Sequence, residues 1–60
     1  MEPKKIAQKI IDHSGMEVSK MFVHTLVNLK EEEYPYEFAG FKGNKNFWKK
    51  VLIEVEQWED

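Results

Sequence analysis

The 60-residue sequence contains no cysteine, which removes two of the usual ways of stabilising a very small domain. Neither a disulfide nor a thiolate zinc site can form without it. The two histidines, His13 and His24, have no carboxylate or histidine at a metal-ligand spacing, and we therefore expect no metal and no cofactor. A chain of this length buries only about 60% of its unfolded surface. Association with another chain is the reinforcement that remains.

Arginine is also absent, because all nine basic residues are lysines; with eleven acidic residues the formal net charge is −2. Arginine is the preferred side chain for reading guanine edges and for bidentate contacts to phosphate. Its absence argues against sequence-specific binding of nucleic acid. The exclusive use of lysine is typical of AT-rich genomes and suggests a bacterial or phage origin.

Long apolar runs are missing as well. No run approaches the roughly 20 residues that span a bilayer, and we expect no membrane partner. The first ten residues, MEPKKIAQKI, lack the apolar core of a signal peptide, which predicts a cytoplasmic protein. The sequence has no repeats and no linkers, and we expect residues 1–60 to form a single small domain.

The first helix is predicted over residues 3–14. Pro3 suits the first helical turn, where its missing N–H costs nothing. The apolar stripe of this helix is Ile6, Ala7, Ile10 and Ile11. Gly15 can end the helix in the left-handed conformation while Ser14 caps the next one. A tight corner between two helices is expected here.

The longest apolar-rich run, residues 18–29, fits two incompatible periods. Read as a helix, it places five apolar residues on one face. These are Val18, Met21, Phe22, Leu26 and Leu29. Ser14 and Glu17 have the spacing of a capping box before the run, and Pro35 supplies a stop after it. This interpretation predicts a helix over residues 16–33.

Read as a strand, the same run alternates apolar and polar residues, with Met21, Val23 and Val27 on one face. A two-stranded hairpin at 20–42 and an α-β-β-α fold would follow. That hairpin would turn through Lys-Glu-Glu-Glu, which offers no glycine, asparagine or aspartate for a positive φ. The missing turn chemistry and the capping box favour the helix.

Residues 34–43, YPYEFAGFKG, contain four aromatic residues, whose rings we expect to fold back onto the core or to form a short strand. The last helix is predicted over residues 45–59, capped by Asn44 or Asn46. Its apolar face holds Phe47, Trp48, Val51, Leu52, Val55 and Trp58. The expected fold class is mainly α: three short helices with an aromatic-rich extended segment between the second and the third.

Some apolar residues do not fit these stripes. Val23 and Val27 lie one turn apart on the side of the central helix away from its main stripe, and Ile53 falls among polar residues of the last helix. A helix that is apolar all round is usually buried all round. The central helix therefore either lies between the other two or forms an interface. Since aromatic residues are also enriched in binding hot spots, the residues predicted to bind a partner are Val23, Val27, Tyr34, Tyr36, Phe38, Phe41, Lys49, Lys50, Ile53, Glu54, Glu56 and Trp58.

The charges of the last helix run against the helix macrodipole. The helix is opened by Lys42, Lys45, Lys49 and Lys50 and closed by Glu54, Glu56, Glu59 and Asp60. The macrodipole favours the reverse order by about 0.3–1 kcal/mol per terminal charge at low salt. Either surface charge drifts freely at this energy, or the helix pairs antiparallel with its own copy across a two-fold axis. In such a pair Lys49 and Lys50 face Glu56 and Glu54 of the other copy, with Ile53 near the axis.

Part of the chain resembles winged helix-turn-helix DNA-binding domains. The resemblance rests on residues 6–9, on Gly15, and on Val18-Ser19-Lys20 with the chain that follows to Tyr34. In that family a helix that opens with such a Val-Ser pair enters the major groove, and the chain after it forms the wing; here the wing would be residues 36–42. The sequence departs from the pattern in three ways. Its leucine spacing differs, the interval before Gly15 is long, and Lys20 is the only basic residue on the helix that would enter the groove.

The serine, threonine and histidine residues form no recognisable catalytic arrangement in the sequence, and we expect no enzymatic activity. Ser14 is expected to cap a helix, and His24 and Thr25 are helix neighbours that point about 100° apart. The predicted function is a small non-enzymatic protein–protein interaction module. It would be a cytoplasmic regulator or inhibitor that occupies a partner's surface, alone or as a homodimer, with no small-molecule substrate. The alternative implied by the resemblance is a DNA-binding regulator.

Overall fold

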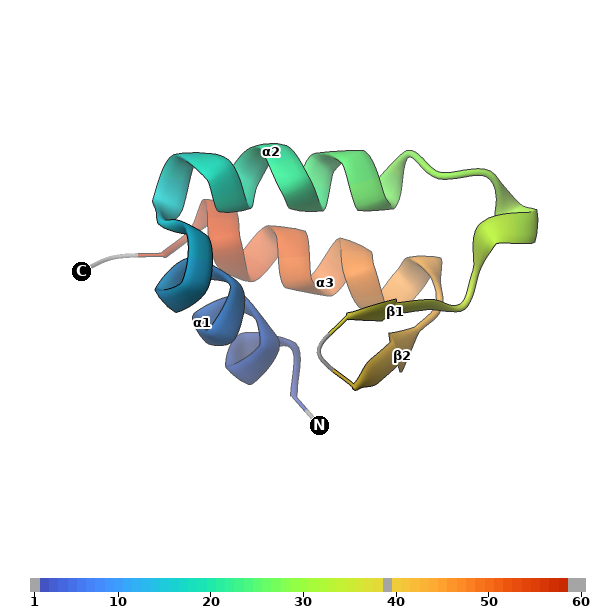
Figure 1. Ribbon diagram of the computed structural model, residues 1–60, viewed down its shortest axis with the longest axis horizontal. Coiled ribbons are helices and arrows are strands. Elements are labelled where there is room, and N and C mark those ends of the chain that lie inside the picture. The colour runs from blue at the N-terminus through green and yellow to red at the C-terminus, as the bar shows by residue number, and fades with distance from the viewer. Residues whose placement is uncertain (1, 39, 59–60) are drawn as a thin grey trace.

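Three helices enclose one apolar core, and a short hairpin connects the second helix to the third. The computed structural model of the protein describes residues 2–38 and 40–58. Its elements are α1 (Pro3–Ser14), α2 (Met16–Val27), the 3₁₀ turn η1 (Glu31–Glu33), β1 (Tyr36–Phe38), β2 (Phe41–Gly43) and α3 (Lys45–Glu56). Figure 1 shows α2 and α3 side by side, with α1 at one end of the pair and the hairpin towards the other. The predicted mainly α fold class, with an extended aromatic segment before the last helix, is confirmed.

All three helices contribute to the core. Its fully buried apolar residues are Ile6, Ala7, Ile10, Val23, Leu26, Trp48, Val51 and Val55. Helix α3 packs against both α1 and α2, which contact each other less extensively. The central place in the bundle therefore belongs to α3, and the expectation that α2 lies between the other two helices is wrong.

The corner between α1 and α2 consists of one residue, Gly15. The predicted bounds of α1 are confirmed, and Gly15 has the expected positive φ, with φ of 83° and ψ of 166°. This region of backbone space is essentially restricted to glycine. The capping box is wrong, because an N-cap residue needs an extended backbone and Ser14 is still helical. Instead, the buried Ser19 hydroxyl donates to the carbonyl oxygen of Gly15 at 2.5 Å.

The helical interpretation of the central run is confirmed over α2, and the alternative with a hairpin at 20–42 is wrong. Helix α2 ends at Val27, however, and not at residue 33. Two side chains supply partners for its last carbonyl groups: the Asn28 amide donates to the His24 carbonyl at 3.0 Å, and the Tyr34 hydroxyl donates to that of Leu26. Because helix ends leave such carbonyls without intrahelical partners, these bonds stabilise the early stop.

The buried face of α2 differs from the predicted stripe. Ser19, Val23 and Leu26 are the buried residues of the helix. Val18 and Met21, which we expected in the core, are 55% and 71% exposed. The helix is therefore rotated about its axis relative to the prediction, and its polar core residue is Ser19.

The hairpin is short and is held against α3 by Trp48. Its register pairs Tyr36 with Gly43 and Phe38 with Phe41. The indole Nε1–H of Trp48 donates to the carbonyl oxygens of Gly43 at 3.0 Å and of Tyr36 at 3.3 Å, one on each strand. A single buried side chain thus anchors both strands to the helical core.

Helix α3 begins as predicted, because the Asn44 side chain accepts a hydrogen bond from the Phe47 backbone N–H at 2.9 Å. It ends at Glu56, earlier than the expected residue 59. Glu59 and Asp60, which we counted among the acidic residues that close the helix, lie outside the described residues.

The substitution Trp48→Phe should destabilise the protein by about 1–3 kcal/mol, because it leaves the buried Gly43 carbonyl and the partly buried Tyr36 carbonyl without their indole donor. Urea unfolding followed by far-UV circular dichroism measures this loss. Trp58→Phe is the matched control: Trp58 is only half-buried beyond the end of α3, and its replacement should cost less than about 1 kcal/mol. Equal losses for the two variants would contradict the anchoring role of Trp48.

Candidate protein-binding surface

Within residues 2–38 and 40–58, three large apolar side chains are more than half exposed. These are Val18, Met21 and Ile53, which are 55%, 71% and 53% exposed. Val18 and Met21 lie three residues apart on α2 and therefore share one side of the helix. Thr25, one turn further, is exposed as well, and its hydroxyl donates to the Met21 carbonyl at 3.0 Å. We call Val18, Met21 and Thr25 the α2 face.

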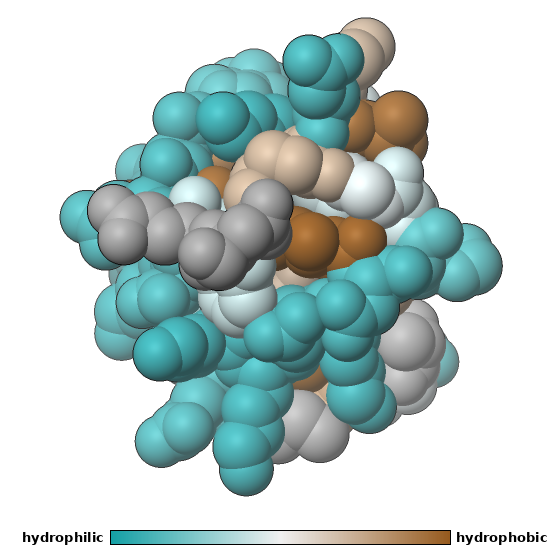
Figure 2. All heavy atoms as spheres, turned by 90° about the vertical axis from the view of Figure 1, so that its left-hand side faces the viewer, coloured by the Kyte–Doolittle hydropathy of each residue, from teal (hydrophilic) through white to brown (hydrophobic). Residues whose placement is uncertain are grey.

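The α2 face borders an aromatic contact with the hairpin. Phe22 is half-buried, and its ring centroid lies 5.3 Å from that of Phe38 on β1. Figure 2 looks onto the end of the molecule where α1 meets α2, and it shows apolar side chains at the surface, framed by polar ones. The molecule therefore presents apolar surface beyond the closed core.

Helix α3 exposes a second, mostly charged face. Lys49, Lys50, Ile53 and Glu56 are exposed and Glu54 is half-buried. We call these five residues the α3 face. Beside it, between α3 and the first turn of α1, lies an open hollow of about 410 Å³, lined by Glu2, Pro3, Lys4, Lys50, Ile53 and Glu54.

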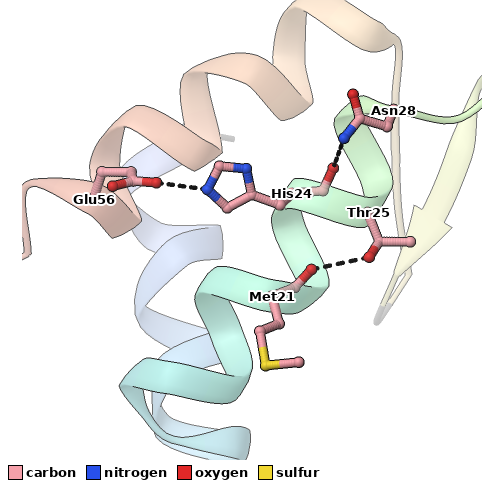
Figure 3. A network of polar contacts seen from close by, with 5 residues as sticks. All are labelled: Met21, His24, Thr25, Asn28 and Glu56. Carbon is pink, nitrogen blue, oxygen red and sulfur yellow. Dashed lines mark hydrogen bonds and ion pairs between the residues drawn. The ribbon is translucent and has the colours of Figure 1, made fainter.

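A histidine–glutamate pair connects the two helices that carry these faces. His24 Nε2 lies 2.7 Å from Glu56 Oε1, and the two side chains are 54% and 46% exposed. Figure 3 shows the His24 ring pointing from α2 towards Glu56 on α3, while the Met21 side chain extends away from the pair. The Thr25 hydroxyl bonds to the Met21 carbonyl and not to His24. His24 therefore connects α2 to α3, and the neighbouring Thr25 hydroxyl is not in hydrogen-bond contact with it.

Other site types find no support in the described part of the chain. Residues 2–38 and 40–58 contain no group of three or more histidine, cysteine, aspartate or glutamate side chains placed to hold a metal ion. None of the helices described is both long enough and apolar enough to cross a membrane. On α2, the helix that would enter the DNA groove in the winged-helix interpretation, the only lysine is Lys20, which is half-buried.

The structure distributes the predicted partner-binding residues among three environments. Val23 is fully buried in the core. Lys49, Lys50, Ile53 and Glu56 are exposed on α3, next to the half-buried Glu54. The remaining residues are half-buried and pack against the core: Val27, Tyr34, Tyr36, Phe38, Phe41 and Trp58. The structure thus brings together the α3 residues and separates Val23 from the surface.

The hairpin aromatics make specific contacts inside the molecule. Tyr36 meets Trp48 edge to face, with 6.0 Å between ring centroids, and Phe41 lies under the Lys9 ammonium, 5.6 Å from its Nζ. These contacts match the expectation that the rings fold back onto the core. Sequence reasoning missed Val18 and Met21, because it assigned both to the buried stripe.

A double-mutant cycle on His24→Ala and Glu56→Ala should give a coupling free energy of about 0.2–1 kcal/mol, because polar contacts between exposed side chains are screened by solvent. Urea unfolding of the wild type, both single variants and the double variant measures it. A coupling above about 2 kcal/mol would mean that the pair is a major support of the fold, and that Glu56 is committed to His24.

No protein-family model matches the chain, and the comparisons with curated proteins and with solved structures also gave no significant match. The surfaces of the molecule itself must therefore indicate its function. Two of them, the α2 face and the α3 face, expose apolar side chains that the core does not cover.

Proposed function

We propose that this protein is a small non-enzymatic protein–protein interaction module. It acts as a cytoplasmic regulator or inhibitor by covering a partner's surface. The observation that carries the proposal is the exposure of Val18 and Met21 on one side of α2. The core takes Ser19, Val23 and Leu26 from this helix instead.

The α2 face suits docking into an apolar groove. Amphipathic helices are recognised in this way through anchors spaced three or four residues apart, which is the spacing of Val18, Met21 and Thr25. Fully burying a valine or methionine side chain contributes about 1.5–3 kcal/mol. Val18 and Met21 are 55% and 71% exposed, so each would supply part of that amount on docking, and the adjoining Phe22–Phe38 contact extends the apolar area towards the hairpin.

The proposal includes association with a second copy. A chain of this size rarely obtains more than about 3–5 kcal/mol from its own core, and a partner chain adds to its stability by mass action. Ile53 is the exposed apolar residue on α3, and charged residues of both signs flank it.

The double substitution Val18→Glu and Met21→Glu should leave the fold intact, because both side chains are exposed and glutamate is a good helix former. It should weaken partner binding, because it replaces both apolar anchors with charged groups. The partner is first captured with the wild type from extracts of the producing cells. The purified, ¹⁵N-labelled wild type and variant are then titrated with the captured protein, and their affinities are compared by NMR. Binding should weaken at least tenfold, which corresponds to about 1.4 kcal/mol.

Lys30→Glu is the matched control for this test. Lys30 is exposed before η1, outside the α2 face, and its reversal changes the net charge by the same amount as the double substitution. The control should bind as the wild type does. Capture of no protein, or equal binding by the wild type and the double variant, would overturn the role of the α2 face.

A further inference from the structure

The charges on the α3 face are sorted by sign along the helix. Lys49 and Lys50 precede Ile53, and Glu54 and Glu56 follow it. Ile53 is 53% exposed, on the side of α3 opposite the buried residues Trp48, Val51 and Val55. The face therefore consists of a basic half, an apolar centre and an acidic half.

The interior of the molecule does not account for this order. The acidic half of the face lies in the last turn of α3, where the helix macrodipole favours basic groups instead. Among residues 2–38 and 40–58, the one contact between side chains of potentially opposite charge within 4 Å is that between His24 and Glu56. Lys49, Lys50 and Glu54 thus form no ion pair with another described residue, although Lys50 and Glu54 share the hollow beside α1 with Glu2 and Lys4.

We propose that the α3 face binds the α3 face of a second copy of this chain, with the two helices antiparallel across a two-fold axis that passes close to Ile53. This inference rests on the proposed interaction function and names one of its partners. An isologous interface of this kind requires a surface that is complementary to itself. A face with one basic and one acidic half meets that requirement only when the helices run in opposite directions.

Helix geometry sets which residues meet. With the axis at Ile53, a residue n positions before Ile53 lies level with the residue n positions after Ile53 in the other copy. Each further position along the helix shifts this level by about 1.5 Å. Lys49 is then offset by about 1.5 Å from Glu56 of the other copy, and Lys50 by about 3 Å from its Glu54. The turn of about 100° per residue puts the first pair on one flank of Ile53 and the second pair on the opposite flank.

The remaining features of the face agree with this arrangement. Glu56 accepts a hydrogen bond from His24 through Oε1, and its second carboxylate oxygen can accept one from a lysine ammonium of the other copy. The hollow of about 410 Å³ lies on the Lys50 and Glu54 flank of Ile53, and the second copy would cover it. Parallel helices would instead place lysine against lysine and glutamate against glutamate.

The expected dimer is weak and sensitive to salt. Each α3 has 12 residues, and a single pair of such helices lies at the low end of interface sizes. Exposed charge pairs are screened as the ionic strength rises. The dimer should therefore form between micromolar and millimolar protein concentrations and dissociate in high salt.

Charge exchange between two variants tests the pairing by sedimentation equilibrium. Lys49→Glu with Lys50→Glu makes the face acidic throughout, and Glu54→Lys with Glu56→Lys makes it basic throughout. Each variant alone should remain monomeric under conditions in which the wild type dimerises. An equimolar mixture should restore a dimer, because every contact is then between opposite charges. A wild type that is monomeric at millimolar concentration, or variants that dimerise as the wild type does, would overturn the proposal.

A cross-link tests the position of the axis. Since the chain has no cysteine, Ile53→Cys introduces a single thiol, and mild oxidation should link two copies at least tenfold faster than for Glu17→Cys. Glu17 is exposed on α2, outside the α3 face. Equal rates for the two variants would overturn the placement of Ile53 at the axis. The Val18→Glu and Met21→Glu variant should still dimerise, which separates this proposal from that of the α2 face.

Discussion

The buried indole of Trp48 is the interaction on which the rest of this small structure depends. Its ring is fully buried and lies edge to face with both Tyr36 and Phe47, at centroid distances of 6.0 and 5.3 Å. Its Nε1–H bonds to both strands of the hairpin. An isolated two-stranded hairpin is marginally stable in water. The hairpin is therefore stabilised by its contacts with the helical core. In turn, the hairpin positions the aromatic rings that cover that core.

The first and last helices, α1 and α3, were predictable because their local signals agree. Pro3 begins α1 and Gly15 ends it, and the apolar stripe between them has one consistent period. Asn44 caps α3, and its apolar residues fall on one face with Ile53 correctly left outside. Where capping, propensity and periodicity indicate the same structure, the fold follows from the sequence.

The orientation of α2 was not predictable in the same way, because the helix carries two overlapping apolar stripes. The core uses the stripe that contains Ser19, which a count of apolar residues disfavours. A serine hydroxyl that bonds to the carbonyl four residues earlier can be buried without a partner from another element, and Ser19 does so with Gly15. Val18 and Met21, on the more continuous stripe, are left at the surface as a result.

The hairpin lies within the segment expected to be extended, whereas the α-β-β-α alternative had placed a hairpin at 20–42. That alternative used Lys-Glu-Glu-Glu as its turn, whereas the observed turn lies between Phe38 and Phe41, where Gly40 has a φ of 85°. A glycine flanked by aromatic residues was the available signal. The candidate surfaces follow the same pattern: the charge order of α3 was visible in the sequence, while the α2 face appeared only once the rotation of the helix was known.

The two candidate surfaces lie on different helices, and this separation affects valency. Met21 extends away from the His24–Glu56 pair that joins α2 to α3 (Figure 3). A dimer formed through α3 would consequently display two copies of the α2 face on one particle. A target that repeats its own binding groove, such as a symmetric oligomer or a polymer, would then be held at two points, and the effective concentration of the second contact would raise the avidity well above the affinity of either contact alone.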